Sequence, residues 1–555
     1  MKRIATAVAA ACLCIGVTAP AAVARPGGHA PTTIQILNVS DWHAQFDPMT
    51  IGGQQVGGAA VLSSYFEQHR AANPNTLTIT AGDAFGASPP LSNFFDEVPA
   101  VLAMNAMGFS VDGLGNHNFD RGVDHLQQMI DLAEFPYVSA NLANVDDELD
   151  GVKPYEIFEF DGVEVAVIGV TNPDAPTLVF PGSFGTIEVT DPVAAVTRAR
   201  KQAKREGADV FVVIAHMGVT AFDGVNPQGP IVDLANGLNP DHIDLVIGDH
   251  TNVAFNGVVN GIPLVENLSK GAQYSRIDIT VDTKNGNVQS VTAEQLTPFA
   301  ANVVPDPDVI ALLAPYRAEL LVELGQIIGT SAIAIPRSDR CGRVDGRLCE
   351  SLVGNVVTDA MRTAYGTDFA LTNSGGLRDA LTCPAAGNDT CAPYSPPPFN
   401  ITKGQALAVL PFGNQSATVT VSGAELKAFL ERGVSGSPAP VGSFAQVSGL
   451  CFTYDVHVAP GSRVTSVVRQ AADGTCTTTA VDLTAGVSYS LATNDFVASG
   501  GDGYPVVISR ATTRNQMDQD LRDYVAANSP LNPAIQGRIV CTSSGATACP
   551  APPIP

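Results

Sequence analysis

The chain has 555 residues, more than a single hydrophobic core usually serves, so two domains are expected. Hydrophobic residues at 45% and charged residues at 15% indicate an ordinary folded protein and argue against a disordered one. The formal net charge of −24 argues against binding to a nucleic-acid polymer. It does not exclude small anionic substrates, because a bound metal ion reverses the local field.

The first residues have the pattern of a secretory signal peptide. Lys2 and Arg3 precede an apolar run over residues 4–17, and small residues at 22–24 suit cleavage, so residues 1–24 are predicted to be removed. No stretch is long enough to span a bilayer, so no integral membrane segment is expected in the mature chain. The protein is therefore expected to be exported, and to be secreted, periplasmic or associated with the cell surface.

Five apolar runs in the first half of the chain are predicted to be buried β-strands, because they are short and rich in β-branched residues. They lie at residues 34–39, 76–80, 210–215 and 243–247, and in a run that ends at residue 114. Amphipathic stretches between them predict helices at residues 59–70, 123–133 and 192–205. This order predicts a layered α/β fold, in which sites lie beyond the carboxyl ends of the strands.

Each of these runs leads to residues that can bind a metal ion. The candidates are Asp41, His43, Asp83, Asn116, His216, His250 and Asn252. Asp and Asn also begin ordinary turns, but five strands with Asp, His or Asn at the same end are hard to attribute to turns alone. Carboxylate, imidazole and amide groups without thiolate suit Zn²⁺, Mn²⁺ and similar ions. About seven ligands exceed the needs of one tetrahedral ion, so two divalent metal ions that share a carboxylate are predicted.

The segment from Gly115 to Asp120 carries further chemistry. Gly115 permits a tight turn, and His117 can hold or release a proton near neutral pH. Asp120 lies three residues beyond His117, close enough to orient the imidazole if the segment begins a helix. A polar loop with a surface histidine is the alternative interpretation of these six residues alone.

The residues around these candidates form five motifs in a fixed order. They are Ser40-Asp41-Trp42-His43, Gly82-Asp83, Gly115-Asn116-His117-Asn118-Phe119-Asp120, Ala215-His216 and Gly248-Asp249-His250-Thr251-Asn252. The motifs resemble those of the calcineurin-like metallophosphoesterases. More closely, they resemble those of the 5′-nucleotidase family, which includes periplasmic UDP-sugar hydrolase and ecto-5′-nucleotidase.

This resemblance implies a β-sandwich flanked by helices and assigns a role to each candidate. One metal ion would be held by Asp41, His43, Asp83 and Asn252. The other would be held by Asp83, Asn116, His216 and His250, and the catalytic pair would be His117 and Asp120.

Three positions depart from the family's usual pattern. Ser40 stands where Asn is usual, and Ala44 stands where Gly is usual. The last ligand is usually His or Gln and is here Asn252, whose reach is shorter. This departure affects the occupancy and identity of one metal ion rather than the fold.

A helix predicted at residues 309–328 separates the two halves. Proline precedes it and Gly329 follows it, as is usual at helix boundaries. We interpret residues 305–329 as a connector between a catalytic domain at residues 30–304 and a second domain at residues 330–541. A proline-rich tail follows at residues 542–555.

The second half contains several short motifs, and for each glycine cluster taken alone a tight turn is the alternative interpretation. The motifs are Leu371-Thr372-Asn373-Ser374-Gly375-Gly376-Leu377-Arg378, Leu410-Pro411-Phe412-Gly413-Asn414, Thr493-Asn494-Asp495-Phe496 and Ser499-Gly500-Gly501-Asp502-Gly503-Tyr504. Arg347 is a further candidate in this half. Together they resemble the C-terminal substrate-specificity domain of the 5′-nucleotidases, which implies an α/β or α+β domain.

In that domain Phe412 and Phe496 would sandwich a nucleobase, and Asp502 would accept hydrogen bonds from ribose hydroxyls. Phosphate or ribose oxygens would be bound by Arg347, Asn373 and Arg378. Core packing is the alternative for the two phenylalanines taken alone.

The cysteines outside the signal peptide all lie in the second half. An even number in an exported chain predicts disulfides, and the absence of a CxxC spacing argues against a zinc ribbon. Short spacings favour local pairs, although the sequence leaves other connectivities open. The predicted pairs are Cys341–Cys349, Cys383–Cys391, Cys451–Cys476 and Cys541–Cys549.

The sequence thus predicts an exported two-metal phosphoesterase that acts on a small-molecule nucleotide, most simply a 5′-nucleotidase. The alternatives within the family are a 2′,3′-cyclic-nucleotide phosphodiesterase/3′-nucleotidase and a UDP-sugar pyrophosphatase. A nucleotide-binding or interaction protein with a decayed centre is the non-enzymatic alternative. Asn252 favours it, whereas the intact Asp83, Asn116, His117 and His250 oppose it.

Overall fold

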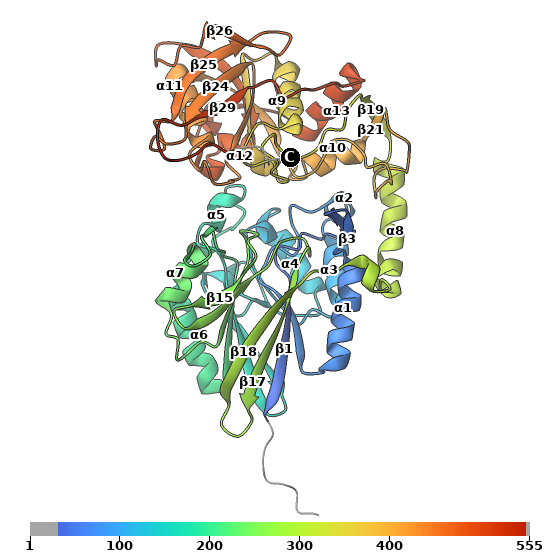
Figure 1. Ribbon diagram of the computed structural model, residues 1–555, viewed down its shortest axis with the longest axis vertical. Helices are drawn as coiled ribbons and strands as arrows, with labels where there is room; N and C mark the ends of the chain where they lie inside the picture. Colours follow the sequence, from blue (N-terminus) through green and yellow to red (C-terminus); the bar gives the residue numbers. More distant parts are fainter. Residues whose placement is uncertain (1–30, 551–555) are drawn as a thin grey trace, which may run out of the picture.

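The computed structural model describes residues 31–550, which form two α/β halves joined by helix α8 (Pro307–Leu324) (Figure 1). This layout confirms the predicted fold class. The predicted signal peptide at residues 1–24 lies outside the described residues. No helix among residues 31–550 is long and apolar enough to cross a bilayer.

The first half is a sandwich of two six-stranded sheets, with the orders β18-β17-β1-β4-β5-β6 and β15-β16-β14-β11-β9-β8. The strands β1, β4, β5 and β6 are parallel, and so are β9, β11, β14 and β16, so each set presents its carboxyl ends at one edge. The first sheet comprises β1 (Thr32–Asn38), β4 (Thr76–Thr80), β5 (Val111–Gly113), β6 (Tyr137–Val138), β17 (Tyr274–Asp282) and β18 (Asn287–Leu296). The second comprises β8 (Tyr155–Phe160), β9 (Val163–Val170), β11 (Val210–Ala215), β14 (Leu245–Gly248), β15 (Phe255–Val259) and β16 (Ile262–Glu266).

A hydrophobic core lies between the two sheets. Ile34 and Ile36 of β1 and Ile79 of β4 belong to the same buried cluster as Val212 and Ile214 of β11. Every residue of β11 is buried, because helices cover the outer face of its sheet. A strand buried on both faces requires a continuous apolar run, which is the pattern that predicted this strand.

Helices flank the sandwich on both sides. The first sheet packs against α1 (Ala59–Ala72), α3 (Val98–Met107) and α4 (Val123–Leu132), and the second against α6 (Pro192–Glu206) and α7 (Pro230–Gly237). Local chemistry sets the ends of α6. The Asp191 carboxylate accepts from the Ala194 N–H at 2.7 Å, Pro192 occupies the first turn, and Gly207 ends the helix at a φ of 116°.

The second half contains a five-stranded sheet, β23-β20-β27-β22-β28, and a four-stranded sheet, β26-β25-β24-β29. The first comprises β20 (Phe369–Asn373), β22 (Gln415–Ser422), β23 (Ala445–Ser448), β27 (Ser488–Asn494) and β28 (Thr512–Gln516). The second comprises β24 (Leu450–Asp455), β25 (Val464–Gln470), β26 (Cys476–Ala480) and β29 (Ile539–Thr542). The longer helices are α9 (Leu352–Tyr365), α11 (Gly423–Gly433) and α13 (Met517–Asn528).

The connector helix ends earlier than the sequence predicts. Helix α8 stops at Leu324, and the segment expected to complete it forms β19 (Ile327–Ser331) instead. This strand pairs antiparallel with β21 (Phe399–Thr402) of the second half. The prediction was therefore wrong for residues 325–328, because a distant strand satisfies the backbone groups that a further helical turn would have used.

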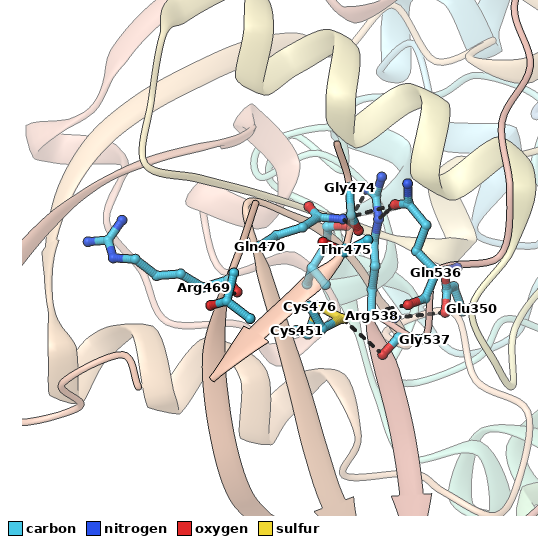
Figure 2. The surroundings of a disulfide bond; sticks show 12 residues. Glu350, Cys451, Arg469, Gln470, Gly474, Thr475, Cys476, Gln536, Gly537 and Arg538 are labelled. Atoms are coloured by element: carbon cyan, nitrogen blue, oxygen red, sulfur yellow. Dashed lines mark hydrogen bonds between the residues drawn. A yellow bond between two sulfur atoms is a disulfide. The ribbon is translucent and has the colours of Figure 1, made fainter. Parts of the chain in front are cut away.

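All four predicted disulfides are present, with Cα separations of 5.8–5.9 Å. Figure 2 shows the surroundings of the disulfide with the largest sequence separation, which joins Cys451 of β24 to Cys476 of β26. The two strands lie on either side of β25, so this bond fastens the outer edge of the four-stranded sheet. The side chain of Gln470 in β25 donates to the carbonyl of Gly474 at 2.7 Å and holds the same turn.

Candidate metal centre and substrate cleft

The predicted ligands lie just beyond the carboxyl ends of strands in both sheets. They follow β1 (Asp41, His43), β4 (Asp83), β5 (Asn116), β11 (His216) and β14 (His250, Asn252). Five of them have left-handed backbones with φ between 40° and 78°, namely Asp41, His43, Asp83, His250 and Asn252. Such a conformation costs on the order of 1 kcal/mol for a residue with a side chain, and its clustering is typical of a functional site.

Four ligand atoms converge in what we call the His216 set, which consists of Asp83, Asn116, His216 and His250. The Nε2 atom of His216 lies 3.0 Å from Asp83 Oδ2, 3.0 Å from His250 Nδ1 and 3.2 Å from Asn116 Oδ1. Ligands of a tetrahedral ion are separated by about 3.4 Å when each lies about 2.1 Å from the metal. The set therefore fits a divalent ion.

A second group, the Asp41 set, consists of Asp41, His43 and Asp83. Its ligand atoms lie within 4.8 Å of one another. The Nδ1 atom of His43 is 2.7 Å from the Gly86 carbonyl, which leaves Nε2 to face Asp41 Oδ1 at 3.8 Å. Asp83 belongs to both sets, so the structure places this carboxylate where it could bridge two ions.

Asn252 lies at the rim of the centre rather than inside it. Its side chain is exposed, and its amide donates to the His250 carbonyl at 3.4 Å. Asp249, which the sequence analysis did not name as a ligand, is buried, and its ligand atom lies within 4.8 Å of those of Asp41 and His216. A carboxylate directly at the end of β14 was the sequence signal for this residue.

The protonation of the centre follows from burial and from its carboxylates. Burial lowers the pKa of His43 to about 3 and that of His250 to about 4, so both rings are neutral and carry free lone pairs. Burial has the same tendency at His216, but the adjoining Asp83 carboxylate outweighs it and raises the pKa of His216 to about 9. The buried carboxylates thus favour a cation at this place, which is the charge that a metal ion supplies.

His117 and Asp120 form the pair that the sequence predicts. The imidazole Nδ1 of His117 is 3.0 Å from both carboxylate oxygens of Asp120. The second of these oxygens also accepts from the Ala87 N–H at 3.1 Å, and the His117 N–H donates to Asp83 Oδ1 at 2.8 Å. The pair is therefore held from both sides, and its backbone is tied to the metal ligands.

Gly115 serves this arrangement by its small size. A Cβ atom at this position would lie 2.2 Å from Asp83 Oδ1 and 2.7 Å from the ring of His216. The loop after β5 thus approaches the ligands as closely as a backbone can, and any side chain would displace Asp83.

A cavity of about 680 Å³ lies between the two halves and brings the remaining candidates to the centre. Its walls include Asn116, His117, Asp120 and His250 from the first half, and Arg347, Asn373, Arg378, Phe412, Phe496 and Asp502 from the second. The Phe412 ring is stacked against His117, with a centroid separation of 5.7 Å and an interplanar angle of 17°. The Asn373 side chain donates to Asp502 Oδ2 at 2.8 Å.

A group of basic residues adjoins the cleft, although the chain as a whole is acidic. Burial, followed by the nearby Arg347 and Arg337, lowers the pKa of Arg378 to about 9. Burial, followed by Arg337 and Arg378, lowers the pKa of Lys270 to about 7. The sequence analysis named Arg347 and Arg378 but missed Arg337, which lies close to Arg347 in sequence, and Lys270, which lies far from all three. This gathering of cations suits a polyanionic ligand such as phosphate.

The two halves also touch at points around the cavity. The side chain of Asn93 donates to the Pro411 carbonyl at 2.9 Å. From the connector, Arg317 of α8 forms ion pairs with Asp47 of the first half and Asp389 of the second. These contacts join the second half, which carries the aromatic residues, to the first half, which carries the candidate metal ligands.

Comparison with known families assigns the two halves separately. Residues 34–254 match the calcineurin-like phosphoesterase family, and residues 327–508 match the 5′-nucleotidase C-terminal domain. The first match contains all seven predicted metal ligands, and the second contains all six predicted substrate-binding residues.

Individual relatives share this arrangement over most of the chain. The 5′-nucleotidase of Vibrio cholerae is 26% identical, over 90% of this chain and 91% of the relative. The crystal structure of a 5′-nucleotidase precursor from Thermus thermophilus superposes with a TM-score of 0.78 at 26% identity, covering 92% of this chain and 99% of that one. Endonuclease YhcR of Bacillus subtilis is 28% identical over 85% of this chain, which spans only 37% of the length of that relative.

Proposed function

The chain belongs to the 5′-nucleotidase family of metallophosphoesterases, and we propose that it is an exported enzyme that hydrolyses nucleotides to nucleoside and phosphate. The observation that supports this most strongly is the shared cavity. One space of about 680 Å³ is lined by the candidate metal ligands Asn116 and His250, by the His117–Asp120 pair and by two phenylalanines from the other half.

The metal centre would hold two divalent ions, one in the His216 set and one in the Asp41 set, with Asp83 common to both. When bound, such ions supply Lewis-acid stabilisation to phosphate oxygens and lower the pKa of water. The neutral rings of His43 and His250 and the buried carboxylates fit ions of the Zn²⁺ or Mn²⁺ type.

His117 would handle the proton of the leaving group. Because the Asp120 carboxylate accepts hydrogen bonds, it favours a hydrogen on Nδ1 of His117 and leaves Nε2 to exchange a proton with substrate. Asp120 also stabilises the imidazolium that forms during the reaction. His117 would thereby protonate the departing 5′-oxygen or stabilise its developing charge.

The second half would select the substrate. Phe412 and Phe496 would stack on the two faces of the base, and Asp502 would accept from ribose hydroxyls. Arg347, Asn373 and Arg378 would bind phosphate or ribose oxygens. Because ligands and clamp belong to different halves, we propose that the second half, at residues 330–541, swings on the connector at residues 305–329 to admit substrate to a catalytic domain at residues 30–304.

Export of the protein is supported by the signal-like residues 1–24 and by the four disulfides, since disulfides persist in oxidising compartments.

The test is phosphate release from a panel of AMP, 3′-AMP, cyclic 2′,3′-AMP, ATP and UDP-glucose, with Mn²⁺ or Zn²⁺ added. We expect AMP to be the best substrate, with activity lost on chelation. Preference for cyclic 2′,3′-AMP or 3′-AMP would assign the phosphodiesterase/3′-nucleotidase alternative, and preference for UDP-glucose would assign the pyrophosphatase. Binding of nucleotide without turnover of any member would indicate a decayed centre.

A further inference from the structure

We infer that Asp339 is a positioning residue for Arg347. Together with the disulfide between Cys341 and Cys349, its carboxylate fixes the segment of residues 339–349, which we call the Arg347 loop, so that Arg347 lines the cleft. The inference rests on the proposed function, because it concerns how the cleft binds the phosphate of its substrate. It adds residues that the predicted substrate-binding set does not include.

One carboxylate organises this loop. Asp339 is only 6% exposed, and its two oxygens accept four backbone N–H groups. Its Oδ1 atom accepts from Cys341 at 3.0 Å and from Arg343 at 3.1 Å, and its Oδ2 atom accepts from Leu348 and Cys349, both at 3.0 Å. These donors lie on both arms of the loop, so a single buried side chain holds the two arms together.

A covalent bond and close packing restrict the same loop. The disulfide joins Cys341 to Cys349, whose Cα atoms are 5.9 Å apart. Gly346, directly before Arg347, has a φ of 69°, and a Cβ atom there would lie 2.6 Å from the Arg337 carbonyl oxygen. The loop is thus closed at its ends and packed closely beside Arg347, which leaves the backbone at this residue little freedom.

The backbone of Arg347 is anchored, and its side chain lines the cleft. Its N–H donates to Asp345 Oδ1 at 3.3 Å, and its carbonyl accepts from the Val441 N–H at 3.3 Å. Its Nε atom is buried without a hydrogen-bond partner among residues 31–550. With no protein acceptor at that atom, the guanidinium group takes its direction from the backbone that the loop fixes. A group directed in this way can present two N–H groups to an oxyanion in the cleft.

The experiment is a double-mutant cycle on the full-length, Mn²⁺-loaded protein, with Asp339→Asn, Arg347→Met and the two combined. Asparagine offers one acceptor oxygen and places an NH₂ group against two of the four donors, so the loop loses its order. We expect Asp339→Asn alone to lower kcat/KM for AMP by about 10- to 100-fold, mainly through KM. In the Arg347→Met background the same change should cost less than about twofold, because the residue that Asp339 positions is already absent.

The disulfide is tested in the same way. The double variant Cys341→Ser/Cys349→Ser should lower kcat/KM for AMP in the wild-type background and not in the Arg347→Met background. The matched control is Cys451→Ser/Cys476→Ser, which removes a bond at the outer edge of the four-stranded sheet. It should leave kcat/KM within about twofold of wild type, because its loop carries no residue of the cleft.

Equal losses for Asp339→Asn in both backgrounds would overturn the inference, because a purely structural role does not depend on Arg347. If Asp339→Asn does not fold, the double serine variant of Cys341 and Cys349 completes the cycle in its place.

Failure of the proposed function is recognised by a second cycle, which measures the binding of inorganic phosphate to the same proteins by calorimetry. Coupling in phosphate binding, in a wild type that hydrolyses no nucleotide, would refute the nucleotidase and keep the positioning role. A wild type that hydrolyses AMP while the two substitutions act additively would do the reverse. A wild type that neither hydrolyses nucleotides nor binds phosphate would refute both.

Discussion

The substitution Asp120→Asn tests the proposed role of the His117–Asp120 pair with almost no change in shape. One carboxylate oxygen of Asp120 accepts from the Ala87 N–H at 3.1 Å, and both lie 3.0 Å from Nδ1 of His117. Asparagine has one acceptor oxygen. Since the Ala87 N–H requires an acceptor, the oxygen of the amide will stay there, and its NH₂ group will take the place of the other carboxylate oxygen, also 3.0 Å from Nδ1 of His117.

One acceptor and one donor then lie beside Nδ1 in place of two acceptors, so the variant weakens the preference for a hydrogen on Nδ1. The variant also lacks the negative charge that stabilises an imidazolium. Loss of acid–base assistance of this kind costs about 10²–10⁴ in rate, or roughly 3–5 kcal/mol of transition-state stabilisation. We expect kcat for AMP to fall by that factor while KM changes little.

The assay is steady-state phosphate release from AMP and from p-nitrophenyl phosphate at fixed Mn²⁺, with metal content measured in parallel. The aryl phosphate has a good leaving group that needs little protonation, so its kcat should fall less than that for AMP. Metal content should remain at the wild-type level, because Asp120 is not among the proposed ligands. If Asp120→Asn keeps AMP turnover within about threefold of wild type, the pair does not carry the proton.

Four further outcomes are expected. Asp83→Ala should lose most bound metal by elemental analysis, and retention of two equivalents would rule out a bridging role. Replacing both Phe412 and Phe496 by alanine should impair AMP turnover severely and spare p-nitrophenyl phosphate; equal losses would argue against a base clamp. Arg317→Met should widen the molecule in small-angle scattering, because it removes the ion pairs that join the connector to both halves; an unchanged radius would count against them as a latch. Burial raises the pKa of Glu266 to about 8, so the folded chain retains a proton that the unfolded chain releases near pH 4.5. The free energy of unfolding of the metal-free protein should therefore fall as the pH rises from about 4.5 to 8, and Glu266→Gln should remove this part of the slope in denaturant titrations at several pH values.

The sequence by itself determined the elements whose signals are local. A buried strand such as Val210–Ala215 is a continuous apolar run in the sequence, and the polar residue that follows, His216, marks its carboxyl end. Helix α6 carries its boundaries in Asp191, Pro192 and Gly207. Three of the disulfides follow from short spacings, since cysteines eight residues apart meet readily. Such features depend on neighbours in the chain, so a pattern over a few residues contains them.

Only the tertiary structure decided which of these residues meet. The end of α8 at Leu324 depends on a strand some 70 residues further on, which pairs with β19. Asp249 follows β14 directly in the sequence, but only the fold buries it beside Asp41, about 200 residues away. Lys270 joins the arginines of the second half in the same way. Burial and long-range electrostatics are properties of the packed molecule, because both depend on what surrounds a group in space and not on what precedes it in the chain.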